Sequence, residues 1–248
     1  MQRDDDKEHG DGEHGDGAGI AVSPFNPLPA LLWLLLLAII VVEAVLWAGG
    51  QGLIGGSQAL GWRLEAITRY GFSGAVQSVM LENRHFAGAY LLRYATFSFI
   101  HTGPMHAFFV VVLLAALGKY VGDAFGALRL LAVLAPATLG GAVIFGLIIG
   151  EGERAWLVGG MPMVFALVGA ASWWRWQRPA ESGEDDARRR RAVWLIGGVM
   201  LLRAVIGVTI EPGHAWIADL GAFGLGLALA AVIGPGGWAM IRARLRAR

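Results

Sequence analysis

The chain has 248 residues, of which 56% are hydrophobic and 16% are charged, and its mean hydropathy is +0.56. This composition is too apolar for an ordinary soluble domain and indicates a membrane protein. The 20 Lys and Arg residues nearly balance the 19 Asp and Glu residues, so the chain lacks the basic surplus that nucleic-acid binding requires. It contains no cysteine, which excludes disulfides, thiolate metal sites and cysteine nucleophiles.

The N-terminal segment, residues 1–28, is acidic, poor in apolar residues and carries a tandem EHGDG repeat at residues 8–12 and 13–17. It cannot bury a core, so we predict a disordered tail. Its acidic start is unlike a signal peptide, and the apolar run that follows is expected to remain as a membrane helix. His9 and His14 lie beside acids in the repeat, but ordering a Gly-rich tail around an ion is costly. We therefore predict no metal site and no cofactor.

Six apolar stretches are long enough to cross about 30 Å of hydrocarbon as helices. They lie at about residues 30–49, 104–121, 129–149, 159–174, 192–210 and 214–234. The predicted fold class is therefore all-α, a polytopic bundle of six transmembrane helices within a membrane domain over residues 29–237. Residues 50–103 are too many for a turn and too amphipathic for a linker, so we expect a large outer loop with its own structure at the membrane surface.

The distribution of Lys and Arg predicts the orientation of the bundle. With the N-terminus inside, the inner segments hold 14 of these residues and the outer loops hold 5. The inner set includes the run Arg188–Arg191 and a basic tail at residues 238–248. Both termini are therefore predicted to be cytoplasmic, in an integral multi-pass protein that we assign to a bacterial inner membrane.

Three motifs stand out in chain order: FSFIHTGPMHAFF at residues 97–109, GGMPMVFALVGA at residues 159–170 and ADLGAFGLG at residues 218–226. Together they resemble the motifs of the rhomboid family of intramembrane serine proteases. The resemblance covers about residues 27–237 and implies the six-helix rhomboid fold. It also implies a mechanism in which a serine at the start of span four attacks the substrate, a histidine on span six takes its proton, and span two helps to hold the oxyanion.

The chain departs from the family pattern at the positions that carry this chemistry. Met161 stands where the family has its serine, Pro162 follows in place of glycine, and Asp219 stands where the family has its basic histidine. Val110 replaces the usual oxyanion-stabilising asparagine, while His106 is retained. A thioether cannot form an acyl-enzyme, so we predict a pseudoprotease with no intact catalytic residue.

The resemblance to rhomboid pseudoproteases implies binding of single-span membrane proteins, in addition to the lipid bilayer, without cleavage. Two alternatives stay open: an active endopeptidase with a non-standard site, and a small-solute transporter that uses the charges within the spans. Aspartyl protease chemistry would need a second intramembrane aspartate opposite Asp219, which the sequence does not offer.

Three ionisable residues fall inside the spans: Glu43, Arg203 and Asp219. Because a charge in hydrocarbon costs roughly 2.5–3.5 kcal/mol, each is expected to be partnered, hydrated or, for a carboxyl group, protonated. We take His101, His106 and Asp219 as candidate binding residues. The alternative for His101 is to satisfy backbone groups at the turn before span two, and for His106 and Asp219 to form hydrogen bonds within the bundle.

Glycine and alanine are frequent in spans four and six, which suits close packing of two helices in lipid. We predict that these spans contact each other through small residues, namely Gly159, Gly160, Gly169, Gly221, Gly224 and Gly226.

Overall fold

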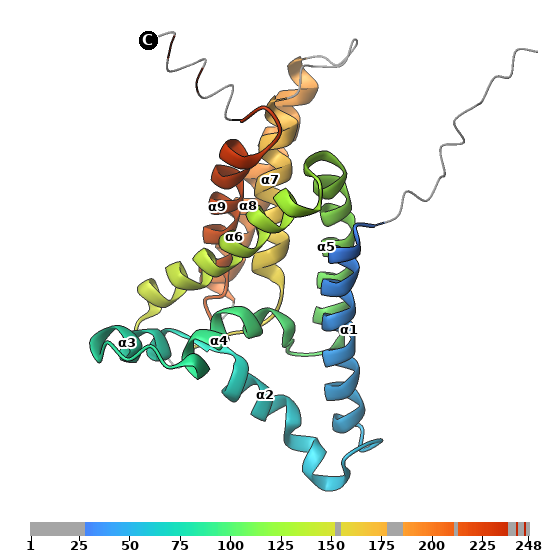
Figure 1. Ribbon diagram of the computed structural model, residues 1–248, viewed down its shortest axis with the longest axis vertical. Helices are drawn as coiled ribbons and strands as arrows, with labels where there is room; N and C mark the ends of the chain where they lie inside the picture. Colours follow the sequence, from blue (N-terminus) through green and yellow to red (C-terminus); the bar gives the residue numbers. More distant parts are fainter. Residues whose placement is uncertain are drawn as a thin grey trace, which may run out of the picture.

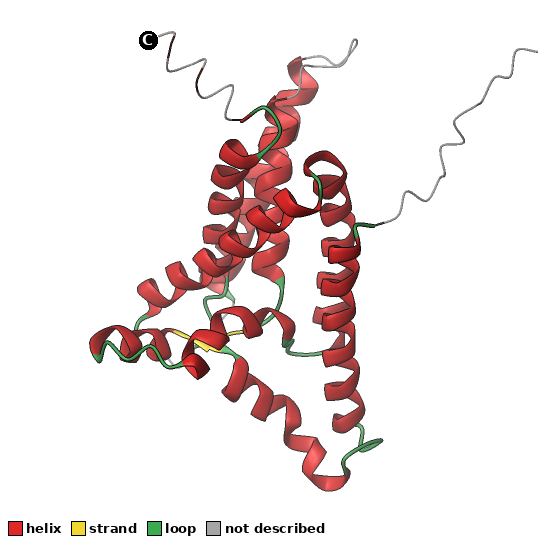
Figure 2. Ribbon diagram, viewed as in Figure 1, coloured by secondary structure: helices red, strands yellow, loops and turns green. Residues whose placement is uncertain are grey.

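The computed structural model describes residues 28–151, 155–177, 186–210 and 213–237, together with Arg242 and Arg246. The predicted N-terminal tail with His9 and His14, and most of the basic C-terminal tail, lie outside these ranges. Helices make up most of the described chain (Figure 2). They are α1 (Ala30–Gly50), η1 (Gly56–Gly61), α2 (Trp62–Tyr70), α3 (Gly74–Glu82), α4 (Gly88–Thr96), η2 (Phe97–Phe99), α5 (Pro104–Phe125), α6 (Ala127–Ile149), α7 (Met161–Gln177), α8 (Asp186–Thr209) and α9 (Trp216–Ile233).

The all-α, polytopic membrane fold predicted from the sequence is confirmed. Within the described ranges, four helices are long and apolar enough to cross a membrane: α1, α5, α6 and α9. The other two predicted spans also form helices, but α7 has 17 residues and the apolar part of α8 covers only Trp194–Thr209. The six apolar stretches thus become six helices, and the crossing of the membrane by α7 and α8 stays a prediction.

Two of the six helices meet at a very short connection that the sequence explains. Pro104 opens α5 in its first turn, where the missing N–H has no intrahelical partner to lose. Gly126 joins α5 directly to α6 with φ of +79°, a conformation that glycine adopts without steric cost. Helix α5 therefore runs toward one end of the bundle and α6 runs away from it (Figure 1). The start of α1 and the end of α9 lie at this same end.

The segment between α1 and α5 contains helices α2, α3 and α4, which gather at the other end of the bundle (Figure 1). A short antiparallel pairing attaches it to the chain before α7: β1 (Phe72–Ser73) pairs with β2 (Trp156–Leu157). Aromatic side chains pack beneath this pairing, with Phe72, Phe97 and Phe145 fully buried. The loop segment therefore helps to position the residues at the start of α7.

Helices α7 and α9 pack with their backbones in direct contact. A Cβ added at Gly169 would meet the carbonyl oxygen of Phe223, and one added at Gly226 would meet the carbonyl oxygen of Ala166. Only glycine permits such an approach, as expected for helices that associate in lipid. Gly169 and Gly226 thus lie at the contact that the sequence predicts between these two spans.

The other four glycines do not join α7 to α9, and the prediction is wrong for them. Gly221 faces α6, where an added Cβ would lie 3.0 Å from Cδ1 of Ile144, and Gly224 has open space around it. Gly159 and Gly160 precede α7 and face α5 instead. The reason is the rotation of α9 about its axis, which presents Gly221 and Gly226 to different neighbours.

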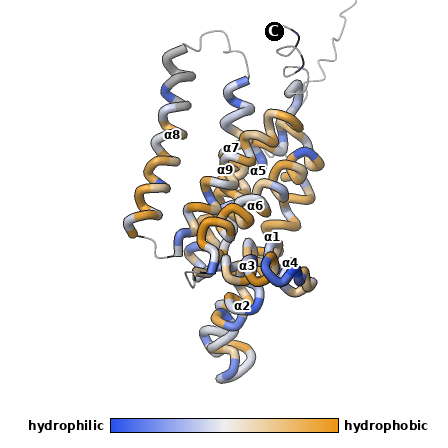
Figure 3. Tube along the Cα trace, turned by 90° about the vertical axis from the view of Figure 1, so that its left-hand side faces the viewer, coloured by the Kyte–Doolittle hydropathy of each residue, from blue (hydrophilic) through white to orange (hydrophobic). Residues whose placement is uncertain are grey.

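Helix α8 stands apart from the remaining helices along most of its described length (Figure 3). Trp194, Leu195 and Leu202 are each more than half exposed. Its buried contact lies near its C-terminal end, where Gly207 is so close to Trp216 that a Cβ would overlap the indole ring. This end of α8 is thus anchored to the start of α9, while Trp194, Leu195 and Leu202 are left largely uncovered by protein.

Candidate functional site

The turn before α5 and the turn before α7 are joined by a buried histidine. His101 is fully buried, and its Nε2 accepts a hydrogen bond from the backbone N–H of Gly160 at 3.3 Å. The N–H of the neighbouring Gly159 donates to the carbonyl oxygen of Phe97 at 2.9 Å. His101 therefore satisfies a backbone N–H group, as one of the two predictions for it expected. That group belongs to the turn before α7, whereas the prediction placed it in the turn before span two.

His106, in the first turns of α5, lies against His101 with ring centroids 5.2 Å apart and the rings nearly perpendicular. Its Nδ1 lies 3.2 Å from the hydroxyl oxygen of Thr102. Gly159, at φ of +99°, passes so close that a Cβ would lie 2.5 Å from Cε1 of His106. Two of the candidate binding residues thus form one cluster with the backbone of residues 159 and 160.

Burial in the protein, with smaller electrostatic contributions from the nearby His106 and Arg63, lowers the pKa of His101 from 6.5 to about 4. The ring is therefore neutral near pH 7. Because Nε2 accepts a hydrogen bond, the proton of the neutral ring resides on Nδ1. His101 can thus hold the Gly160 N–H only in its unprotonated form.

The two positions that the motif comparison aligns with the serine and the asparagine carry apolar side chains that pack into the bundle. Met161 is the first residue of α7 and packs, half-buried, against the main core. Val110 is fully buried on α5, and its Cγ1 would lie 2.6 Å from a Cβ at Gly160. The turn held by His101 is therefore followed by a thioether and packed against an isopropyl group, and neither group can form an acyl-enzyme or donate a hydrogen bond.

Asp219, at the position of the family's basic histidine, forms an ion pair with Arg203. The Oδ2 atom of Asp219 lies 2.6 Å from Nη2 and accepts a hydrogen bond of 2.8 Å from Nε of Arg203. Asp219 is fully buried, and the Arg203 side chain is 17% exposed. The pair joins α8 to the first turn of α9, so both charges are partnered, one of the three outcomes foreseen for them.

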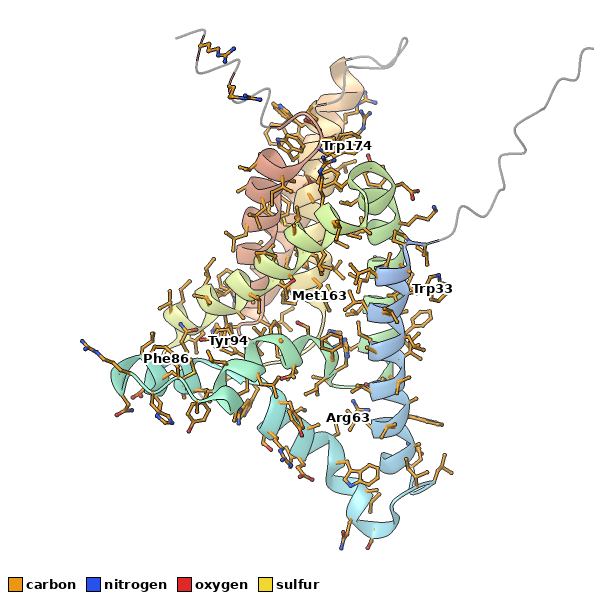
Figure 4. The ribbon with its side chains drawn as sticks, in the orientation of Figure 1. Trp33, Arg63, Phe86, Tyr94, Met163 and Trp174 are labelled. Atoms are coloured by element: carbon orange, nitrogen blue, oxygen red, sulfur yellow. The ribbon has the colours of Figure 1, made fainter. Side chains whose placement is uncertain are left out.

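The third intramembrane charge is partnered as well. Arg63 of α2 donates to both carboxylate oxygens of Glu43 on α1, at 2.6 and 3.0 Å. The same guanidinium donates to the carbonyl oxygen of His101 at 2.6 Å. Arg63 thereby links α1, the loop segment and the histidine turn (Figure 4). The sequence did not predict this role, because Arg63 is one of several charged residues in the amphipathic loop segment. Nothing in the sequence distinguishes it from the others.

No group of three or more His, Asp or Glu side chains in the described ranges could hold a metal ion. What the arrangement offers is a neutral His101 imidazole packed against His106, a buried ion pair and, between them in the chain, an apolar helix start. Such groups can donate and accept hydrogen bonds at a membrane helix without supplying an attacking atom.

The comparisons with known proteins bear on the family alone. No curated protein matches the chain. A family model for the rhomboid domain matches residues 88–236, which is more than half of the chain and includes helices α4 to α9. The match begins after α1, α2 and α3, later than residue 27, where the motif resemblance was placed. The residues of all three motifs lie inside it, and the chain belongs to the rhomboid family.

Proposed function

We propose that this protein is a rhomboid-like membrane protein that binds transmembrane segments of other proteins and does not cleave them. The observation that carries the proposal is the pairing of Asp219 with Arg203 together with Met161 at the position of the nucleophile. A carboxylate held by a guanidinium is a poor acceptor for a hydroxyl proton, and a thioether has no proton to give. The two aligned positions therefore supply neither the nucleophile nor the base that acyl transfer through a serine and histidine pair requires.

The uncovered part of α8 supports the binding role. Its large apolar side chains are exposed around the helix, while only its C-terminal end is held, by Gly207 and by Arg203. A helix that leaves most of its surface without a protein neighbour provides space for a second membrane helix to pack beside it (Figure 3). Arg203, whose side chain is 17% exposed and held by Asp219 at this anchored end, offers a hydrogen-bond donor to a client backbone that is locally unwound.

An activity assay tests the first half of the proposal. The purified full chain is incubated in proteoliposomes with a panel of single-span substrates of rhomboid proteases. We expect no cleavage above a protein-free control. Cleavage that one side-chain substitution abolishes would establish an active endopeptidase with a non-standard site, and the proposal would be wrong.

Site-specific photocrosslinking tests the second half. A photoreactive residue is placed at Leu202 of α8 or, as a matched control, at Leu37, which is 54% exposed on α1. The probes are synthetic membrane-spanning peptides, one with a central Gly-Pro-Asn sequence and one of leucine throughout. We expect saturable crosslinking at Leu202 to the first peptide only, reduced by Asp219→Asn. Equal crosslinking at Leu202 and Leu37, or no preference between peptides, contradicts client binding.

A further inference from the structure

Apart from the histidine cluster and the ion pair, the structure contains an apolar cavity of about 400 Å³ between α1 and α6, to whose lining α4 and η2 also contribute. Leucine side chains from both long helices form its walls, among them Leu31 and Leu35 of α1 and Leu131 of α6. Met163 of α7 also lines the cavity and is 4% exposed, so it lies at the bottom. Figure 4 shows Met163 between α6 and α1, on the opposite side of α1 from Trp33.

The mouth of this groove faces the membrane interior. Leu34 and Leu131 line it and are 64% and 41% exposed, and both lie on helices that are long and apolar enough to span a membrane. An apolar cavity does not hold water, because water finds no hydrogen-bond partners there. What lies next to the mouth of such a groove in a bilayer is lipid hydrocarbon.

The size of the groove decides what can occupy it. A membrane-spanning helix of about 20 residues is about 30 Å long and about 11 Å across with its side chains, which is a volume of about 2,900 Å³. The cavity is several times smaller than such a helix. A transmembrane helix, whether from a client or from a second copy of this chain, therefore does not fit, whereas an extended hydrocarbon chain does.

One polar atom in the wall of the groove determines the orientation of a bound molecule. Ser98 of η2 lines the cavity, is 3% exposed, and its hydroxyl oxygen has no hydrogen-bond partner among the described residues. A buried hydroxyl without a partner is unfavourable, and an acceptor atom on the ligand would satisfy it. Hydrocarbon offers no acceptor, but the ester carbonyl at the head of a phospholipid acyl chain does.

We propose that the groove between α1 and α6 binds one acyl chain of a bilayer phospholipid. The ester carbonyl accepts a hydrogen bond from Ser98, and the chain extends past Met163 toward Leu31 and Leu131. This site does not depend on the client-binding proposal, since α8 takes no part in it.

A photoactivatable lipid tests the site directly. The full chain is placed in nanodiscs of phosphatidylcholine that contain a trace of phosphatidylcholine with a diazirine at mid-chain, and adducts are mapped by mass spectrometry. Random contact with surrounding lipid labels exposed residues such as Leu37. A chain in the groove labels the buried Met163 as well. Adducts on Leu37 without adducts on Met163 would overturn the proposal.

Variants separate the groove from the general lipid surface. Ala38→Phe and Ala135→Phe fill the groove from opposite walls, and Ala44→Phe places the same ring at an exposed position of α1 outside it. We expect the first two to abolish Met163 adducts and the third to leave them unchanged, with all three eluting as monodisperse protein. If Ala135→Phe does not fold, Ala135→Leu takes its place. Persistence of the Met163 adducts in folded, groove-filled variants contradicts the site.

Two further arms complete the test. Ser98→Ala is expected to reduce Met163 adducts, because it removes the hydrogen bond to the carbonyl, and unchanged labelling would overturn the assignment of the polar end.

The chain has no cysteine, so a single Leu131→Cys reports on contact between copies. Disulfide-linked dimers of this variant, together with unlabelled Met163, would make the groove a dimer contact and the proposal wrong.

Discussion

His101 shows how a buried ionisable side chain can be structural in a site that is catalytic elsewhere in a family. It is neutral, fully buried and holds the backbone N–H of Gly160, so it fixes the start of α7 against the start of α5. The groups around it, Met161 and Val110, supply no chemistry for peptide hydrolysis. Under the proposed function, the site keeps the family's geometry without its reactivity.

The lowered pKa of His101 predicts a pH dependence of stability. The folded-state pKa of about 4 is below the ordinary value of 6.5, so the unfolded state binds the extra proton between these values. Stability from this residue is complete above pH 6.5 and decreases by about 3 kcal/mol as the pH falls to 4. The measurement is the free energy of unfolding in detergent from pH 7 to pH 4.

Two variants identify the residue responsible. His101→Asn should remove this part of the pH dependence and cost about 1–3 kcal/mol at pH 7, because Gly160 loses its acceptor. His85→Asn, at an exposed histidine of the loop segment, should keep the wild-type profile. A His101→Asn profile parallel to that of the wild type would show that the ring is not held neutral in the folded state.

At the scale of elements, two glycines on one helix predict opposite effects of the same substitution. Gly226→Ala places a Cβ against the carbonyl oxygen of Ala166 on α7 and should destabilise the protein by about 1–3 kcal/mol. Gly224→Ala meets open space and should stabilise the helix by about 0.5–1 kcal/mol. Unfolding of both variants in detergent measures the difference. The same sign for both would mean that α9 is rotated differently in its bundle.

The ion pair between α8 and α9 predicts a non-additive double substitution. Arg203→Met leaves the buried Asp219 carboxylate without this guanidinium and should cost about 3–5 kcal/mol. Adding Asp219→Asn removes the charge itself and should recover more than half of that loss. Comparison of the two single variants with the double variant gives the coupling free energy. A double variant as unstable as the sum of the two single variants would contradict the pairing.

The helices of this protein were predictable because a helix in hydrocarbon must be apolar over most of its length, and that constraint is visible in one dimension. Position along the chain does not encode rotation about a helix axis, so the neighbours of Gly221 and Gly224 were not predictable. Glu43 pairs with Arg63, which lies on another helix 20 residues further along the chain. The sequence indicates that an intramembrane charge such as Glu43 needs a partner, but it does not identify that partner. The partner of Asp219 was hidden for the same reason.

At the scale of the whole molecule, the course of the chain makes a prediction about topology. The turn between α5 and α6 lies at the same end of the bundle as the start of α1 and the end of α9, and the loop segment lies at the other end (Figure 1). The excess of Lys and Arg on the first side predicts that this side is cytoplasmic. Reporter fusions after residues 85, 151 and 213 should therefore read as exterior, and fusions after residues 126 and 237 as cytoplasmic. This outcome requires α7 and α8 to cross the membrane despite their short apolar stretches. We expect close packing against α9 to compensate for the length of α7, and local thinning of the bilayer to accommodate α8. A cytoplasmic signal after residue 213 together with an exterior signal after residue 151 would show that α7 and α8 do not form two separate crossings, and the six-span fold would have to be abandoned.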